Sequence, residues 1–179
     1  MTGRLNPRSG WTASACSLAR TLEVVSNRSC MLILREAFYG TSRFDDFADR
    51  VGISEPVAAA RLRELVDAGL LTREPYREPG QRTRLAYRLT DKGADLLPAL
   101  VALMQWGDRW LAPTGAPVVY RHHGCGAIVH AELSCAAGHA VGGDELELAT
   151  GPGSRSSTAS SPAAPHAGAP HASIHGTGR

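Results

Sequence analysis

The sequence has few cysteines, few aromatic residues and no strong excess of charge. Four widely spaced cysteines in 179 residues are too few for a disulfide framework. The 19 basic and 17 acidic residues nearly cancel, which excludes a histone-like polycation and an acidic solvating chain. The first residues contain no apolar signal core, and the longest apolar stretch, near Leu96–Met104, is about half of what a membrane span needs. We therefore expect a cytoplasmic protein with no membrane segment.

The charge that is present is unevenly placed. Residues 1–112 carry 16 basic and 13 acidic side chains, whereas residues 113–179 carry 3 and 4. Nearly all the basic residues are arginine, and five of these arginines lie between residues 71 and 90. A general bias towards arginine explains its frequency, so its placement is more informative than its number. Because the guanidinium fork suits phosphate groups and guanine edges, this segment is a candidate for contact with nucleic acid.

Apolar spacing predicts four helices in the first part of the chain. Thr41 or Ser42 is expected to cap the third helix, and Gly52 to end it. Ser54 is expected to cap the fourth helix, whose first turn contains Pro56. The predicted helices cover residues 16–25, 30–40, 44–51 and 54–68.

Two strands of alternating polarity follow, over residues 70–76 and 84–89, with a Pro79-Gly80 turn between them. Thr90 is expected to cap one long final helix over residues 91–111. Two helices joined by a tight turn form a helix-turn-helix unit, and a hairpin after it forms a wing. The order of the elements predicts a mainly α winged helix-turn-helix domain with a small β-hairpin, rather than a helical bundle with one solvated hairpin.

Short motifs between residues 16 and 112 resemble those of HxlR-type regulators, a subgroup of MarR-like winged-helix transcription factors. The resemblance implies a DNA-binding regulator, more specifically a repressor, that binds a roughly palindromic operator in double-stranded DNA as a homodimer. Residues 55–60 depart from the family pattern, since they lack the polar residues often present there. The motifs are Cys16-Ser17-Leu18-Ala19-Arg20-Thr21-Leu22, Leu32-Ile33-Leu34-Arg35-Glu36, Gly40-x-x-Arg43-Phe44, Gly52-Ile53-Ser54, Arg61-Leu62-Arg63-Glu64-Leu65, Ala68-Gly69-Leu70, Tyr87-x-Leu89-Thr90-x-x-Gly93 and Trp106-Gly107.

The candidate DNA contacts fall on the wing and on the predicted recognition helix. Two residues that are two positions apart on a helix point in directions about 200° apart, so Arg61 and Arg63 cannot both point into the groove. We favour Arg61 for the bases and expect Arg63 to pair with a carboxylate. The candidates for phosphate or minor-groove contact are Arg43, Arg77, Arg82 and Arg84, and those on the recognition helix are Ser54, Pro56, Ala60, Arg61 and Arg63.

The predicted final helix carries an apolar stripe that is too wide for one core contact. Either this stripe covers the winged domain, or it forms part of an interface between two chains. The resemblance implies the second alternative, in which the terminal helices and the first helix pair in a homodimer. The stripe comprises Leu96, Leu97, Leu100, Val101, Leu103, Met104, Trp106 and Trp110.

Cys16 lies where the resemblance places a cysteine that senses electrophiles or oxidants. The alternative is an inert helix start, with Ser14 and Ser17 as neighbours. Cys30 lies inside an apolar helix and is expected to be a small core residue. A thiol-sensing regulator is therefore one alternative for the function.

Residues 113–149 are expected to form a small appendage with Cys and His at its turns, similar to a zinc ribbon. Gly138 stands where a second CxxC cysteine is usual, so a structural zinc and a degenerate ribbon without metal both remain open. No cofactor is otherwise required. We expect residues 1–15 to be a flexible arm and residues 150–179 to be disordered. The candidate metal ligands are His122, His123, Cys125, Cys135 and His139.

Two other functions are alternatives to a sequence-specific regulator at the nucleoid. A non-specific architectural DNA-binding protein would use the same arginines without reading bases. A zinc enzyme built on Cys125, Cys135 and His139 lacks a nearby Glu suited to act as general base, and a closed four-ligand site leaves no position for substrate. The sequence therefore favours a DNA-binding protein over an enzyme.

Overall fold

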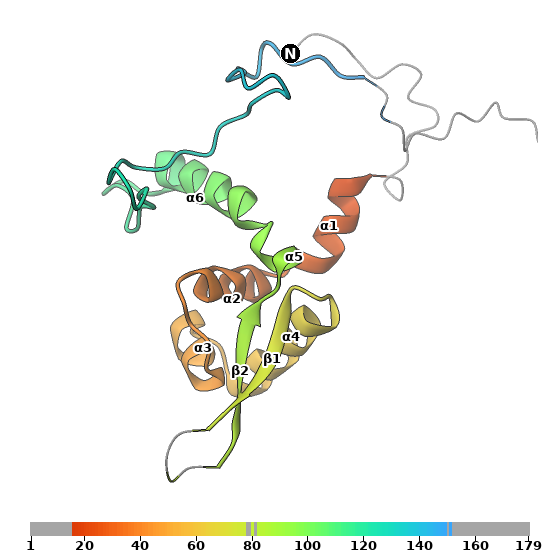
Figure 1. Ribbon diagram of the computed structural model, residues 1–179, viewed down its shortest axis with the longest axis vertical. Coiled ribbons are helices and arrows are strands. Elements are labelled where there is room, and N and C mark those ends of the chain that lie inside the picture. Colours follow the sequence, from red (N-terminus) through yellow and green to blue (C-terminus); the bar gives the residue numbers. More distant parts are fainter. Residues whose placement is uncertain (1–15, 78–79, 81, 150, 152–179) are drawn as a thin grey trace, which may run out of the picture.

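The computed structural model describes residues 16–77, 80, 82–149 and 151. The predicted arm over residues 1–15 and nearly all of the predicted tail lie outside the described residues. Figure 1 shows a group of helices with a hairpin projecting from it, as predicted for a winged helix-turn-helix. The elements are α1 (Ser17–Val25), α2 (Arg28–Phe38), α3 (Phe44–Val51), α4 (Glu55–Asp67), β1 (Leu71–Tyr76), β2 (Arg84–Leu89), α5 (Asp91–Ala94) and α6 (Leu97–Leu111).

The helix starts differ in how they are capped. Asn27 begins α2, and its side-chain oxygen accepts hydrogen bonds from the first free backbone N–H groups of that helix. The prediction that Thr41 or Ser42 caps α3 is wrong, because the residue at the cap is Arg43 and it makes no side-chain cap bond. The Thr41 hydroxyl instead donates to the carboxylate of Glu36, at 3.3 Å. That bond ties the end of α2 to the loop before α3.

The predicted final helix is broken into two. Thr90 caps α5 as predicted, accepting a hydrogen bond from the backbone N–H of Gly93 at 3.1 Å. Gly93 lies so close to the carbonyl of Leu70 that a Cβ at this position would collide with it. The break falls just before Pro98, which lacks the N–H needed to continue the helix from α5.

The core lies between α2, α3, α4 and the base of the hairpin. Ile33, Phe47 and Leu62 are each fully buried there, and the Phe47 ring meets the Tyr87 ring edge-on at 6.1 Å. The hairpin is antiparallel, with a register that runs from Leu71↔Leu89 to Tyr76↔Arg84. This packing fixes α4 and the hairpin relative to each other.

An isolated β-bridge joins the hairpin to the residue before α3. Arg43 forms a bridge with Ala86, and the N–H of Tyr87 donates to the carbonyl of Ser42 at 2.8 Å. Of the predicted Pro79-Gly80 turn, only Gly80 is described, and its φ is 76°. Glycine adopts this left-handed conformation without a steric penalty.

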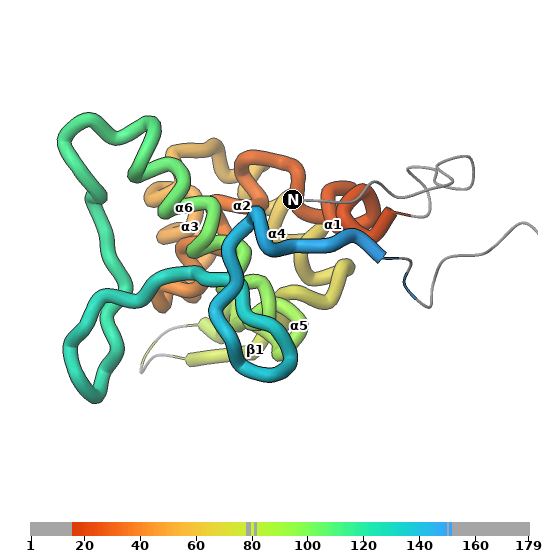
Figure 2. Tube along the Cα trace, turned by 90° about the horizontal axis from the view of Figure 1, so that it is seen from above, coloured from red at the N-terminus to blue at the C-terminus, as the bar shows by residue number. Residues whose placement is uncertain are grey.

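The appendage, residues 113–149, contains no helix or strand and no buried residue. It forms two small turns, closed by the bridges Arg121↔Ile128 and Ser134↔Ala140. In Figures 1 and 2 it starts at the far end of α6 and then crosses towards the side of α1. No helix in the described part of the chain is long and apolar enough to cross a bilayer.

Candidate DNA interface

The turn between α3 and α4 sets the direction of α4. Gly52 ends α3 in the left-handed conformation, with φ 68° and ψ 46°, and Ser54 is the N-cap of α4 as predicted. Ala58, Leu62 and Leu65 on α4 are each 0% exposed, so this side of the helix faces the core. The opposite side of α4 is therefore turned to solvent.

The outward side of α4 carries Pro56, Ala60, Arg63 and Asp67. At about 100° per residue these four positions fall within one face, opposite the buried one. Pro56, Arg63 and Asp67 are exposed and Ala60 is partly buried. This face offers one guanidinium group and one carboxylate beside small apolar surfaces.

Arg61 lies at the flank of α4 and is paired with a carboxylate. Its Nη1 donates to both carboxylate oxygens of Glu64, at 2.6 and 2.7 Å. This contact lowers the pKa of the Glu64 carboxyl. The prediction that Arg63 takes the carboxylate is therefore wrong, because Arg61 takes it and Arg63 stands exposed.

Cys30 lies beneath this ion pair. Its thiol is 1% exposed and donates to Glu64 Oε2 at 3.7 Å. Burial, together with the charge of Glu64, raises the pKa of the Cys30 thiol to about 11. Cys30 is the core residue that the sequence predicted.

The wing projects beyond the helices (Figure 1), and its arginines are exposed. Arg77 and Arg82 flank the tip. Arg84 pairs with Asp45 at 3.6 Å, and Arg88 pairs with Glu74 at 3.4 Å. All four side chains in these two pairs are more than half exposed, so solvent screens both pairs strongly.

The structure brings two of the predicted phosphate ligands together. The guanidinium of Arg43 lies over the Tyr76 ring, 5.6 Å from its centroid, and Tyr76 is the strand partner of Arg84. Sequence reasoning missed both Tyr76 and Asp45 as neighbours of these arginines. The register of the hairpin would have placed Tyr76 beside Arg84, but nothing in the sequence brings Asp45 to Arg84.

The predicted apolar stripe on α6 is divided. Leu100 and Val101 are buried. Leu103, Trp106 and Trp110 are exposed by 58–62%. The winged domain and the appendage therefore leave part of the predicted stripe exposed.

The candidate redox and metal residues lie apart. Cys16 is exposed at the N-cap of α1. In the appendage, the first turn brings His122 Nδ1 to 3.2 Å from Cys125 Sγ, with His123 beside it in the sequence. The second turn holds Cys135, whose pKa is lowered by hydrogen bonds from backbone N–H groups, that of His139 first.

The predicted four-ligand metal site is not assembled. Among the described residues, no three His, Cys, Asp or Glu side chains come together in a way that could hold a metal ion. The reason is local closure: the N–H of His122 donates to the carbonyl of Ala127, and that of Cys135 to the carbonyl of His139. Each turn closes on itself, and Figures 1 and 2 show the two turns well apart.

Two helices joined at a left-handed glycine, followed by an arginine-bearing hairpin, define a winged helix-turn-helix protein, a class that binds DNA. The chain belongs to the HxlR-like helix-turn-helix family, whose model matches residues 24–115. It is therefore a transcriptional regulator of the MarR-like winged type.

Relatives with long matches carry the same description. The uncharacterized HTH-type transcriptional regulator Rv3095 of Mycobacterium tuberculosis is 44% identical over 147 residues, which cover 81% of this chain and 92% of that relative. The uncharacterized HTH-type transcriptional regulator sll1512 of Synechocystis is 32% identical over 101 residues, 56% of this chain and 73% of that relative.

Two solved structures are similar in fold and in sequence. PA1607, described as a transcription factor, has a TM-score of 0.65 and 34% identity, over 75% of this chain and 94% of that chain. PA1374 of Pseudomonas aeruginosa has a TM-score of 0.54 and 35% identity, over 76% and 93%. These two matches cover more of the chain than residues 24–115, which the family model matches, so the similarity is not confined to the helix-turn-helix part.

Proposed function

We propose that the protein is a repressor that binds a roughly palindromic operator as a homodimer. The observation that carries this proposal is the hairpin, which projects beyond the helix-turn-helix (Figure 1) and whose arginines are exposed residues. Such groups neutralise phosphates and release counterions, which makes the affinity strongly dependent on salt. Arg77, Arg82, Arg84 and Arg43 are the proposed phosphate or minor-groove ligands.

The outward side of α4 is proposed to read the bases. Arg63 is exposed there, and arginine donates to the O6 and N7 atoms of guanine. Pro56 and Ala60 on the same side suit contact with thymine methyl groups, and the N-terminus of the helix at Ser54 suits a phosphate. Arg61, held by Glu64, is the alternative reader, and it must leave this ion pair before it can contact DNA.

The homodimer is proposed on the apolar side chains left uncovered on α1 and α6. Leu18 and Leu22 on α1 are 65% and 46% exposed, and Trp106 and Trp110 on α6 are 58% and 62% exposed. Figure 1 places both helices away from the hairpin, so pairing through them leaves the wing free. Two wings related by a twofold axis would meet successive major grooves of a palindrome.

Anisotropy titrations of the full chain test the assignment, using DNA from its own upstream region and a shuffled sequence at several salt concentrations. We expect Arg82→Ala to weaken binding to both DNAs and to lower the salt slope by about 0.9. We expect Arg63→Ala to lose discrimination between the two DNAs by about 1–3 kcal/mol, whereas Arg61→Ala serves as the matched control. Loss of discrimination in Arg61→Ala alone would reverse the two assignments.

Two other measurements test the rest of the proposal. A wild-type affinity ratio near one between the two DNAs would identify a non-specific architectural DNA-binding protein instead. Sedimentation of the free protein should show a dimer, and Trp106→Glu should shift it towards the monomer, because the change places a charge on an apolar interface.

Cys16 gives a second candidate function, a thiol-sensing regulator. Its exposed thiol is two residues from Leu18, on the helix proposed to form the dimer. Oxidation there would change the charge and size of a group beside that interface. Hydrogen peroxide, which oxidises a thiol to a sulfenic or sulfinic acid and is itself reduced to water, should lower the DNA affinity of the wild type and leave that of Cys16→Ser unchanged.

A further inference from the structure

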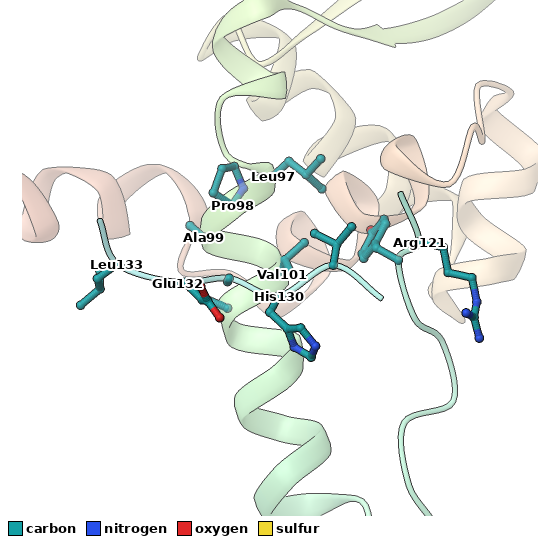
Figure 3. Close-up of a pocket in the computed structure, with 12 residues that line it drawn as sticks. Leu97, Pro98, Ala99, Val101, Arg121, His130, Glu132 and Leu133 are labelled. Atoms are coloured by element: carbon teal, nitrogen blue, oxygen red, sulfur yellow. The ribbon is translucent and has the colours of Figure 1, made fainter. Parts of the chain in front are cut away.

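A cavity of about 720 Å³ lies between the first half of α6 and the appendage. Ala99 and Val101 line it from α6, and Leu133 lines it from the appendage (Figure 3). Cavities of this size hold small organic ligands. We propose that it binds an uncharged, apolar small molecule, and that this molecule regulates DNA binding; the regulatory part rests on the proposed function above.

The chemistry of the walls selects the class of ligand. Pro98 and Ala102 are exposed on the α6 side, and Val129 is 39% exposed on the other side, so apolar surface faces the cavity from both walls. The Arg121 side chain extends away from α6 in Figure 3, and its Nη1 donates to the carbonyl of Gly126 at 2.9 Å. His130 and Glu132 also line the cavity, and the Glu132 carboxylate would repel an anion. With the Arg121 guanidinium engaged elsewhere, the mainly apolar walls favour an apolar molecule over an anion.

The shape of the α6 wall distinguishes a small molecule from a second protein chain. Protein interfaces are anchored by large protruding side chains. The large exposed side chains of α6 include Leu103, Trp106 and Trp110, and none of them lines the cavity. The cavity instead lies over the small residues Ala99 and Ala102, which leave a hollow rather than a ridge.

The appendage wall is held in place from α6. Gln105 Nε2 donates to the carbonyl of Val129 at 2.8 Å, and its Oε1 accepts from the N–H of Ala131 at 3.0 Å. One side chain thus fixes the backbone on both sides of residue 130. The cavity is therefore formed before any ligand enters it.

A chain of contacts leads from the cavity to the helix-turn-helix. Tyr120 lines the cavity, and its ring lies 6.3 Å from that of Tyr39, which follows α2. The Arg35 guanidinium lies 5.8 Å from the Tyr39 ring and pairs with the buried Glu36 at 2.6 Å. Glu36 accepts from Thr41, in the connection between α2 and α3. A ligand that packs against Tyr120 therefore alters contacts that reach the DNA-binding unit.

Binding is tested with N-phenyl-1-naphthylamine, an uncharged probe that fluoresces in apolar surroundings. We expect one probe per full-length chain. Ala102→Trp, which fills the cavity, should weaken binding by about tenfold or more, equivalent to about 1.4 kcal/mol. Ala94→Trp is the matched control on α5, outside the cavity, and should bind as the wild type does. Equal binding by both variants would overturn the site.

Regulation is tested by repeating the DNA titration with saturating probe. We expect the DNA affinity of the wild type to change by about fivefold or more. Tyr39→Leu should still bind the probe and lose this change, because the contact with Tyr120 is removed. A wild-type DNA affinity that is unaffected by bound probe overturns the regulatory role.

Two further outcomes separate this proposal from the proposed function and from binding of a second copy at the cavity. Absence of DNA binding both with and without probe counts against the proposed function alone, while probe binding that Ala102→Trp weakens still supports the site. A wild type that binds no probe, with an Ala102→Trp variant that alters the monomer–dimer equilibrium, assigns the cavity to a second copy and overturns the proposal.

Discussion

The winged part and the appendage of this chain are held together by different forces. Every buried hydrophobic residue in the described part of the chain lies between Val25 and Val101. The appendage is closed by backbone hydrogen bonds within its turns and tied to α6 through Gln105. Burial of apolar area fixes the first region, whereas a few exposed bonds fix the second. The winged part is therefore suited to presenting DNA contacts, and the appendage is suited to responding to a ligand.

The largest expected effect tests whether stability resides in the winged part. Phe47 is fully buried, so Phe47→Ala should cost about 3–5 kcal/mol of unfolding free energy. Ile128 in the appendage is 45% exposed, and Ile128→Ala should cost less than about 0.5 kcal/mol. Urea unfolding followed by circular dichroism measures both values. Comparable losses in the two variants would contradict a difference in the forces that hold the two regions.

The next effect concerns the tie between the regions. Gln105→Ala removes two hydrogen bonds worth about 1 kcal/mol each, so the Ala131 amide should exchange its hydrogen about 5–30 times faster. The amide of Ile33, in the core, should be unaffected. Gln105→Glu is the control, because it keeps an acceptor for the Ala131 N–H and loses the donor to Val129. Equal acceleration at Ala131 in both variants would show that the acceptor is not what protects it.

The same difference explains what the sequence could predict. The order of elements in the winged part follows from apolar spacing and stop residues such as Gly52, since burial imposes a period on the sequence. The appendage contains no buried residue, so its sequence carries no period, and residue types alone suggested a metal site. Two turns that close locally cannot be distinguished in sequence from two turns that meet.

The candidate DNA site was predictable by region but not by individual side chain. The hairpin arginines lie on the wing as its sequence indicated. The roles of Arg61 and Arg63 could not be assigned, because Arg61 has Glu64 three residues on and Arg63 has Asp67 four residues on. Both spacings allow an ion pair on a helix, so only the packing of α4 decides between them. Packing places Arg61 beside Cys30 at the flank and turns Arg63 outward.

Thiol reactivity gives a third test of the difference between the buried core of the winged part and the exposed appendage. At pH 8 we expect a disulfide reagent to modify the exposed Cys16, Cys125 and Cys135 rapidly, and Cys30 only as fast as the core opens. The pKa of the Cys30 thiol, about 11, lies above its unfolded value of about 8.5. Because of this difference in pKa, Cys30 contributes to the stability of the fold at a pH below the pKa of the unfolded chain. The contribution is lost as the pH rises towards 11. Cys30→Ala should remove this contribution to the loss of stability at alkaline pH. Rapid labelling of Cys30 at pH 8 would argue against a closed core.

The last comparison concerns the exposed pair of Asp45 with Arg84. Asp45→Asn removes an ion pair that is more than half exposed and one favourable charge in the first turn of α3, so the loss should stay within about 1 kcal/mol. DNA affinity should rise by about fivefold at low salt, since a carboxylate beside the phosphates is gone and Arg84 is released. Asp91→Asn makes the same change of charge in the first turn of α5, at the base of the hairpin, and should leave the affinity nearly unchanged. An equal gain in both variants would mean that net charge, and not the position of Asp45 at the wing, sets the affinity.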